Sequence, residues 1–252
     1  MIQREDRDGV AVLQLAHGKV NAMDVVLLES LNRMLQELEE SPARALVVTG
    51  SGSIFCAGVD LFKVLDGGPS YLQVFLPVLK ETLERVFFYP KPLVAAINGH
   101  AIAGGCILAC ACDARFMSDG PGKIGAPELR VGVPFPALGL EMLRFALPPQ
   151  YFQEVIYLGR SYAPQQALER GIIDEIVQQN ELLEKACQAA NELAALPPVA
   201  FRHTKEQLRQ PVRDFLTAHA GRIDPEVEKI WSAPETLGRM RDYVEKTIQQ
   251  SE

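Results

Sequence analysis

The chain has 252 residues, of which 48% are hydrophobic and 23% are charged, as is typical of a globular protein. Its formal net charge of −7 argues against a general nucleic-acid binder, because such a protein carries a basic face. No stretch reaches the roughly 18 apolar residues of a membrane span, and residues 1–8 contain no apolar signal core, so we expect a cytoplasmic protein with no membrane partner.

Strands and helices alternate in the first half of the predicted pattern. Apolar residues recur at helical spacing from Val25 to Glu40, and Asp24 is placed to cap that helix. A second helix is expected from Tyr71 to Phe88, with a kink at Pro77. Short strands are expected at residues 10–15, 45–49, 93–97 and 114–117. This alternation predicts parallel strands joined by helical crossovers, and therefore the α/β class.

The second half, after Pro136, is expected to be helical. The pair Pro197-Pro198 interrupts the pattern and predicts a hinge there. We therefore expect a core at residues 1–196 and a C-terminal helical region at residues 197–252. The helical segments are predicted at residues 138–145, 152–158, 164–170, 182–196, 199–208, 225–231 and 234–249.

The five cysteines do not indicate a disulfide framework, because their number is odd and no signal core precedes them. Cys106, Cys110 and Cys112 form a cluster, but their spacing is not that of a zinc site and their neighbours are apolar. A free cysteine packs as a small hydrophobic residue. We expect no metal site and buried thiols.

Two glycine turns carry the strongest functional signal. Gly104-Gly105 stands between the strand at 93–97 and a helix expected from about 105 to 112, and a second turn around Gly58 also follows a strand. Two such turns can each aim a backbone N–H at one point, which is how an oxyanion hole is built. Either turn alone is also explained by a tight bend that needs a positive φ. The spacing matches neither a Walker loop nor a dinucleotide fingerprint.

These segments resemble the crotonase (enoyl-CoA hydratase/isomerase) superfamily. Residues 55–61 resemble its first oxyanion segment and residues 98–113 its second. The turn at 21–23 and the segment at 158–177 resemble further parts of its pattern. The resemblance implies a spiral of ββα units with a C-terminal helical trimerisation region, and a homotrimer or dimer of trimers. It also implies an acyl-CoA substrate whose CoA is part of the substrate, with no separate cofactor.

The resemblance assigns roles to four residues. The N–H groups of Val59 and Gly104 would hold the thioester oxygen, and Glu128 would move a proton. Ile107 stands where hydratases of the family place a first glutamate, and it would crowd water out. A single carboxylate suffices to move a proton between two carbons, so the implied reaction is isomerisation of 3-enoyl-CoA to 2-enoyl-CoA.

Other readings of this site stay open. Glu128 could be a surface carboxylate, as most glutamates are. A hydratase could use Glu128 with a partner such as Glu141. Decarboxylation, thioester hydrolysis and a non-catalytic CoA-binding scaffold are further alternatives. Asp60, Asp113 and His100 are interpreted as structural residues.

The resemblance also implies where substrate binds. Backbone contacts to the CoA moiety are expected from Ala22, Ala57 and Leu61, while Lys19 or Lys63 would meet its phosphates. Phe62 replaces the basic residue that the family has at that position, which weakens the phosphate assignment. Phe135 and Leu138, together with Ile107, are expected to line the acyl pocket, whereas Trp231 is expected only to pack within the C-terminal helices.

Overall fold

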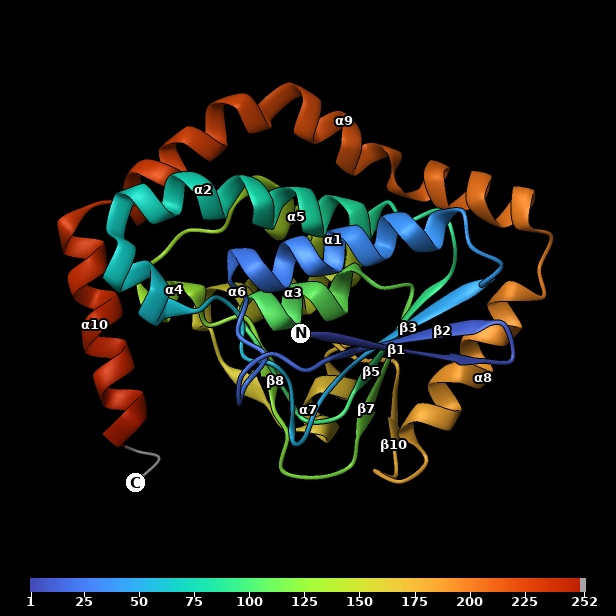
Figure 1. Cartoon of the computed structure of the whole chain (residues 1–252). Coiled ribbons are helices and arrows are strands. Elements are labelled where there is room, and N and C mark those ends of the chain that lie inside the picture. Colours follow the sequence, from blue (N-terminus) through green and yellow to red (C-terminus); the bar gives the residue numbers. More distant parts are fainter. Residues whose placement is uncertain (250–252) are drawn as a thin grey trace.

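The computed structural model describes residues 1–249, and two β-sheets with surrounding helices organise them (Figure 1). The larger sheet has the order β1-β2-β3-β5-β7-β10, in which only the β1–β2 pair is antiparallel. Its strands are β1 (Ile2–Arg7), β2 (Val10–Leu15), β3 (Ala45–Gly50), β5 (Leu93–Ile97), β7 (Ala114–Ser118) and β10 (Glu175–Val177). The smaller sheet contains β4 (Ile54–Cys56), β6 (His100–Ile102), β8 (Ile124–Gly125) and β9 (Ser161–Tyr162).

Three successive segments of the chain repeat one path. Each passes through a strand of the larger sheet and a strand of the smaller sheet, and then enters a helix: β3-β4-α2, β5-β6-α3 and β7-β8-α4. Since β4, β6 and β8 are parallel neighbours, their ends lie at one edge of the smaller sheet. The helices that follow them therefore begin in one region.

The helices cover the sheets from several sides. In Figure 1, α9 runs above α2 and α5, and α10 descends beside the start of α2. One face of the larger sheet packs its valines and alanines against α8. The helices are α1 (Val25–Glu39), α2 (Leu61–Phe87), α3 (Gly104–Ala111), α4 (Glu128–Val131), α5 (Ala137–Ala146), α6 (Pro149–Leu158), α7 (Pro164–Glu169), α8 (Leu182–Ala194), α9 (Pro198–Trp231) and α10 (Pro234–Gln249).

Most predicted elements of the first half are confirmed, but α2 differs. It begins at Leu61, ten residues before the predicted start at Tyr71, because the Asp60 carboxylate accepts a hydrogen bond from Lys63 N at 3.1 Å and caps it. The kink lies at Gly68 and not at Pro77. Gly68 has a φ of 54°, which glycine adopts freely, whereas the fixed φ of proline suits a helix.

The expectation of an all-helical second half is wrong in part. Two short strands lie between its helices: β9 belongs to the smaller sheet and β10 to the larger one. Each strand contains three or fewer residues, which is too few to show a periodic pattern in the sequence. The helices predicted at 199–208 and 225–231 are one helix, α9, which continues through Pro211 and Pro225. The predicted interruption at Pro197 is confirmed, since α8 ends at Ala194 and α9 begins at Pro198.

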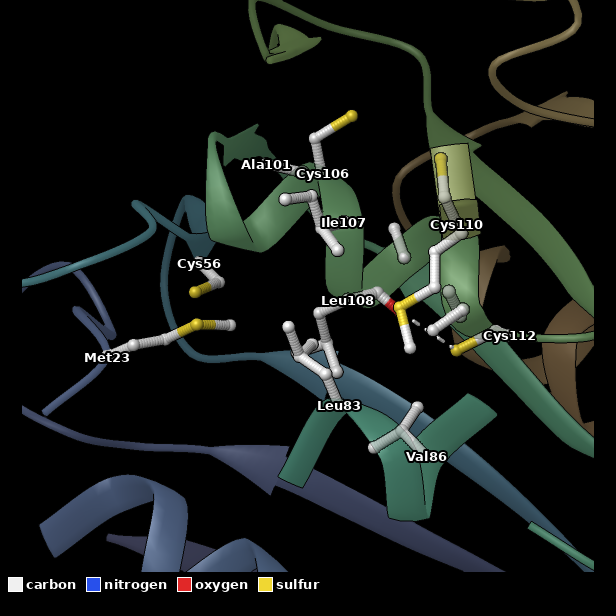
Figure 2. Close-up of a cluster of buried hydrophobic side chains, with 14 of the residues drawn as sticks. Met23, Cys56, Leu83, Val86, Ala101, Cys106, Ile107, Leu108, Cys110 and Cys112 are labelled. Atoms are coloured by element: carbon white, nitrogen blue, oxygen red, sulfur yellow. Dashed lines mark hydrogen bonds between the residues drawn. The ribbon is translucent and has the colours of Figure 1, made fainter. Parts of the chain in front are cut away.

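The cysteines behave as the sequence predicts. All five are free and buried, and Cys106 and Cys110 lie on α3 within the main core (Figure 2). The Cys112 thiol donates to the carbonyl of Leu108 at 3.5 Å. Within residues 1–249, no group of three His, Cys, Asp or Glu side chains could hold a metal ion. None of the helices in that range has both the length and the hydrophobicity to cross a membrane.

Candidate active site

The first residues of three helices meet at one end of the smaller sheet. These are Leu61 of α2, Gly104 of α3 and Glu128 of α4, and all three line the same cavity. A helix leaves its first N–H groups without partners inside the helix. The site therefore combines free backbone donors with one carboxylate.

The two glycine turns touch each other. A Cβ added to Gly58 would stand 2.6 Å from the carbonyl oxygen of Ile102 and 3.0 Å from the nitrogen of Gly104. The first turn is also fixed by Met23, whose N–H donates to the Gly58 carbonyl at 2.7 Å. Only glycine fits at position 58, because its φ is 86° and the space is filled by backbone.

The N–H groups of Val59 and Gly104 are available to a ligand. Both residues line the cavity, and neither N–H donates to an acceptor anywhere in the described chain. The neighbouring donors are occupied: Asp60 N donates to the Met23 carbonyl at 2.9 Å, and Ala103 N to the Gly125 carbonyl at 2.8 Å. Two N–H groups without acceptors, on residues that line one cavity, are what an oxyanion hole requires.

Ala103 holds the second turn in a strained conformation. Its φ of 52° and ψ of −121° place it in a region that favours glycine.

We expect Ala103→Gly to raise the free energy of unfolding by about 1 kcal/mol, because relief of strain outweighs the added freedom of the unfolded chain. Denaturant unfolding measures this. Ala109→Gly, in the interior of α3, is the matched control and should lower the free energy of unfolding by about 1 kcal/mol. If both variants lowered the free energy of unfolding equally, the claim that the Ala103 backbone is strained would be contradicted.

Glu128 is a buried carboxylate without a full set of partners. It is the first residue of α4, only 6% of it is exposed, and its Oε2 has no hydrogen-bond partner. Burial raises the pKa of Glu128 to about 8, since an ionised carboxylate is poorly stabilised away from water. A carboxyl group with such a pKa can release and take up a proton near neutral pH.

The cavity around Glu128 is otherwise apolar. Its volume is about 80 Å³. Glu128 is the only charged side chain among the described residues that line it, and Ile107, the residue at the family's first glutamate position, lines it too. A water molecule held there would find one carboxylate and no second one.

The predicted substrate-binding residues are placed in different surroundings. Ala57 and Leu61 line the cavity, although the Ala57 N–H donates to the Val20 carbonyl at 3.1 Å and is not free. Ala22 lies in the neighbouring turn and does not line it. Leu138 lines an adjoining cavity, whereas Phe135 is buried and lines neither cavity.

Lys63 and Lys19, the two lysines expected to meet the CoA phosphates, differ in their ion pairing. The Lys63 ammonium donates to the buried carboxylate of Asp24, and Nε2 of His17 lies 2.9 Å from the same oxygen. Burial alone would raise the pKa of Asp24, but hydrogen bonds from Lys63, the Leu27 N–H and His17 outweigh it and lower that pKa. Lys63 remains half-exposed, and Lys19 is exposed with no ion pair in the described chain.

The residues interpreted as structural have structural partners. Asp113 accepts hydrogen bonds from Leu93 N, Lys205 and Arg209, which ties α9 to the core. Nδ1 of His100 accepts a hydrogen bond from the Lys123 N–H at 3.3 Å. Glu141 is buried but pairs with Arg144 at 3.1 Å and does not line the cavity.

The sequence analysis did not identify the lining residues that come from α2, α9 and α10. Trp231 of α9 and Tyr243 of α10 line it, and so do Leu79 and Leu83 of α2. Trp231, expected only to pack, also donates its indole N–H to the Pro134 carbonyl at 2.9 Å. No local sequence pattern predicts these contacts, because they depend on how the C-terminal helices pack against the core.

Known proteins resemble this chain along nearly its whole length. The family model described as enoyl-CoA hydratase/isomerase matches residues 5–248. Enoyl-CoA delta isomerase 1, mitochondrial, from Mus musculus is 30% identical over 219 residues, which are 86% of this chain and 76% of that protein. A putative enoyl-CoA hydratase from Thermus thermophilus is 34% identical over 192 residues, 75% of each chain.

A solved structure has the same fold. The crystal structure of human mitochondrial delta3-delta2-enoyl-CoA isomerase matches with a TM-score of 0.94 at 25% identity, and the match covers 100% of this chain and 99% of that one. The predicted crotonase spiral with C-terminal helices is thereby confirmed. The chain belongs to the enoyl-CoA hydratase/isomerase family of acyl-CoA enzymes.

Proposed function

We propose that this protein is an enoyl-CoA isomerase that converts a 3-enoyl-CoA into the 2-enoyl-CoA. The observation that supports this most is the single carboxylate of the cavity, Glu128, in an otherwise uncharged lining. Moving a proton from one carbon to another needs one group that acts first as base and then as acid. Glu128, with a pKa of about 8, suits both roles.

The reaction follows from the placement of donors and carboxylate. The thioester oxygen accepts hydrogen bonds from the N–H groups of Val59 and Gly104. Ionised Glu128 removes a proton from C2, which lies between the carbonyl and the C3=C4 double bond, and the electrons delocalise onto the thioester oxygen. The carboxylic acid so formed returns the proton to C4, and the double bond moves to C2=C3. Each fixed N–H is worth roughly 2.7–4 kcal/mol in the transition state.

The rate is expected to depend on pH in a defined direction. Because Glu128 must be ionised to act as the base, and burial raises its pKa to about 8, kcat/KM for a 3-enoyl-CoA should rise with pH and level off above about 8. A pH–rate profile of the wild-type protein measures this. A profile that is flat from acid to alkaline pH would contradict the assignment of Glu128.

Hydration of 2-enoyl-CoA is the second candidate function. The name of the Thermus thermophilus relative favours it. Water addition by two carboxylates would need a partner for Glu128, and Glu141 is held by Arg144 outside the cavity. This placement supports isomerisation over hydration. Decarboxylation, thioester hydrolysis and a non-catalytic scaffold have no comparable support.

The remaining expectations stay part of the proposal. Ala22, Ala57 and Leu61 would contact the CoA moiety, and Lys19 or Lys63 would meet its phosphates. The enzyme would need no cofactor beyond the CoA of its substrate. It would act in the cytoplasm as a trimer or a dimer of trimers, with the C-terminal region from residue 197 as a separate helical part.

A further inference from the structure

A further cavity, of about 310 Å³, lies at the opposite end of α3 from Gly104. Cys110 and Cys112, at the end of that helix, form part of its lining, and the first half of α9 forms one wall. We call it the α9 cavity. It shares no lining residue with the cavity around Glu128 or with the one that adjoins it. It is therefore separate from the candidate active site.

The lining of the α9 cavity carries one positive charge that no carboxylate balances. Asp113 is the only carboxylate among the described residues that line it, and it accepts hydrogen bonds from Lys205 Nζ at 2.6 Å and from Arg209 Nη2 at 2.7 Å. Arg115 is the third cation of the lining. Asp174, outside the cavity, neutralises Arg115 through hydrogen bonds of 2.6 and 3.1 Å. One carboxylate thus serves two cations, Lys205 and Arg209.

This excess charge is buried. The side chains of Lys205 and Arg209 are only 7% and 4% exposed, and Nη1 of Arg209 has no hydrogen-bond partner in the part of the chain that the structure describes. Burial lowers the pKa of Lys205 to about 8, although the Asp113 carboxylate acts in the opposite direction. A buried cation without a counter-charge is costly, so the cavity favours the entry of an anion.

The other walls of the cavity indicate what kind of anion fits. Phe145 and Leu208 line it and are 42% and 62% exposed, and Leu193 and Phe201 add further apolar surface. An aliphatic chain laid against these side chains would remove apolar surface from water. A dianion such as phosphate would exceed the single unbalanced charge, and its remaining oxygens would face apolar walls. The volume, about 310 Å³, lies in the range of roughly 300–1,000 Å³ found for small-molecule sites.

We propose that the α9 cavity binds a medium-chain carboxylate anion, of the chemical class of a free fatty acid. Its carboxylate pairs with Lys205 and Arg209, and its aliphatic chain lies against Phe145 and Leu208. The ligand neutralises the lining and covers the exposed apolar side chains at the same time. This site is independent of the proposed isomerase reaction.

Calorimetry with octanoate tests the site. The protein is first saturated with dodecanoyl-CoA, which keeps octanoate out of the Glu128 cavity. One octanoate per chain should then bind, and 1-octanol and inorganic phosphate should each bind at least roughly tenfold more weakly. Lys205→Met removes the unbalanced charge and leaves Asp113 paired with Arg209, so it should weaken octanoate binding by roughly tenfold or more.

Leu208→Asp and Leu208→Asn form a matched pair that does not disturb the buried ion pairs, should Lys205→Met fail to fold. Leu208 is exposed at the edge of the cavity, and the two new side chains have the same size. The aspartate should repel octanoate and weaken its binding by roughly tenfold or more, whereas the asparagine should weaken it by roughly threefold through lost apolar contact.

Three results would each overturn the proposal: no binding of octanoate, equal affinity for octanoate and 1-octanol, or equal affinity in folded Leu208→Asp and Leu208→Asn. Octanoate should bind with or without dodecanoyl-CoA and whether or not a 3-enoyl-CoA is turned over. Failure of the isomerase function would therefore leave this test intact, and an active isomerase that does not bind octanoate would contradict only the α9 cavity.

Discussion

Replacing Glu128 with glutamine is expected to reduce kcat for 3-enoyl-CoA isomerisation by roughly 10²- to 10⁴-fold, because the amide cannot take up and return the proton. Glutamine keeps the size of the side chain, so the cavity and the two oxyanion donors stay in place. Affinity for a saturated acyl-CoA should therefore change little. Steady-state kinetics and calorimetry on the same preparation measure both quantities.

The same variant has a second expected effect, on stability. The folded pKa of Glu128, about 8, lies above its ordinary value of 4.5, so the folded state holds a proton that the unfolded chain has released. The free energy of unfolding of the wild type should fall as pH rises from about 4.5 through about 8. Glu128→Gln should lack that decrease. Glu141→Gln is the control, since Glu141 is buried outside the cavity, and it should keep isomerase activity. Near wild-type turnover in Glu128→Gln would contradict the assigned role.

Gly58→Ala is expected to reduce kcat by roughly 10²- to 10³-fold, the effect of losing one oxyanion donor. The new methyl group would stand 2.6 Å from the Ile102 carbonyl and 3.0 Å from Gly104 N, and neither backbone atom can move away cheaply. The turns that carry the Val59 and Gly104 donors must separate. Kinetics on the folded variant, with its fold checked by circular dichroism, measure the loss.

Gly52→Ala provides the matched control for that variant. Gly52 also has a positive φ, 62°, but a Cβ there would meet nothing within 4 Å. It should therefore lose some stability through backbone strain and keep its kcat. If Gly58→Ala and Gly52→Ala had the same activity, contact between the two turns would have no part in catalysis.

Much of the fold could be predicted from periodicity and from the resemblance. The buried strands β2, β3 and β5 are largely apolar, and α1 has both an apolar stripe and its Asp24 cap. The strands of the smaller sheet could not be predicted, because β4, β6, β8 and β9 contain only two or three residues each. Their pairing is determined by tertiary contacts and not by local pattern.

Some residues of the site could likewise be predicted from the sequence, and others could not. The turns at Gly58 and Gly104 could be singled out because each follows a buried strand, and the family resemblance then assigned roles to these turns and to Glu128. The partners of Lys63 could not, since Asp24 is 39 positions away and the pair forms only when α1 and α2 start side by side. Trp231 and Tyr243 reach the cavity from helices near the end of the chain, whereas Phe135, although close in sequence to Glu128, is buried and does not line the cavity.

The fate of the two substrate isomers tests the central claim most directly. The wild-type protein is incubated separately with a 3-enoyl-CoA and with the corresponding 2-enoyl-CoA, and products are followed by mass spectrometry and NMR. A single carboxylate in an otherwise uncharged cavity predicts conversion of the 3-enoyl-CoA into the 2-enoyl-CoA with no change in mass, and no addition of water to the 2-enoyl-CoA. Accumulation of a product heavier by one water, without interconversion of the isomers, would contradict proton shuttling by Glu128.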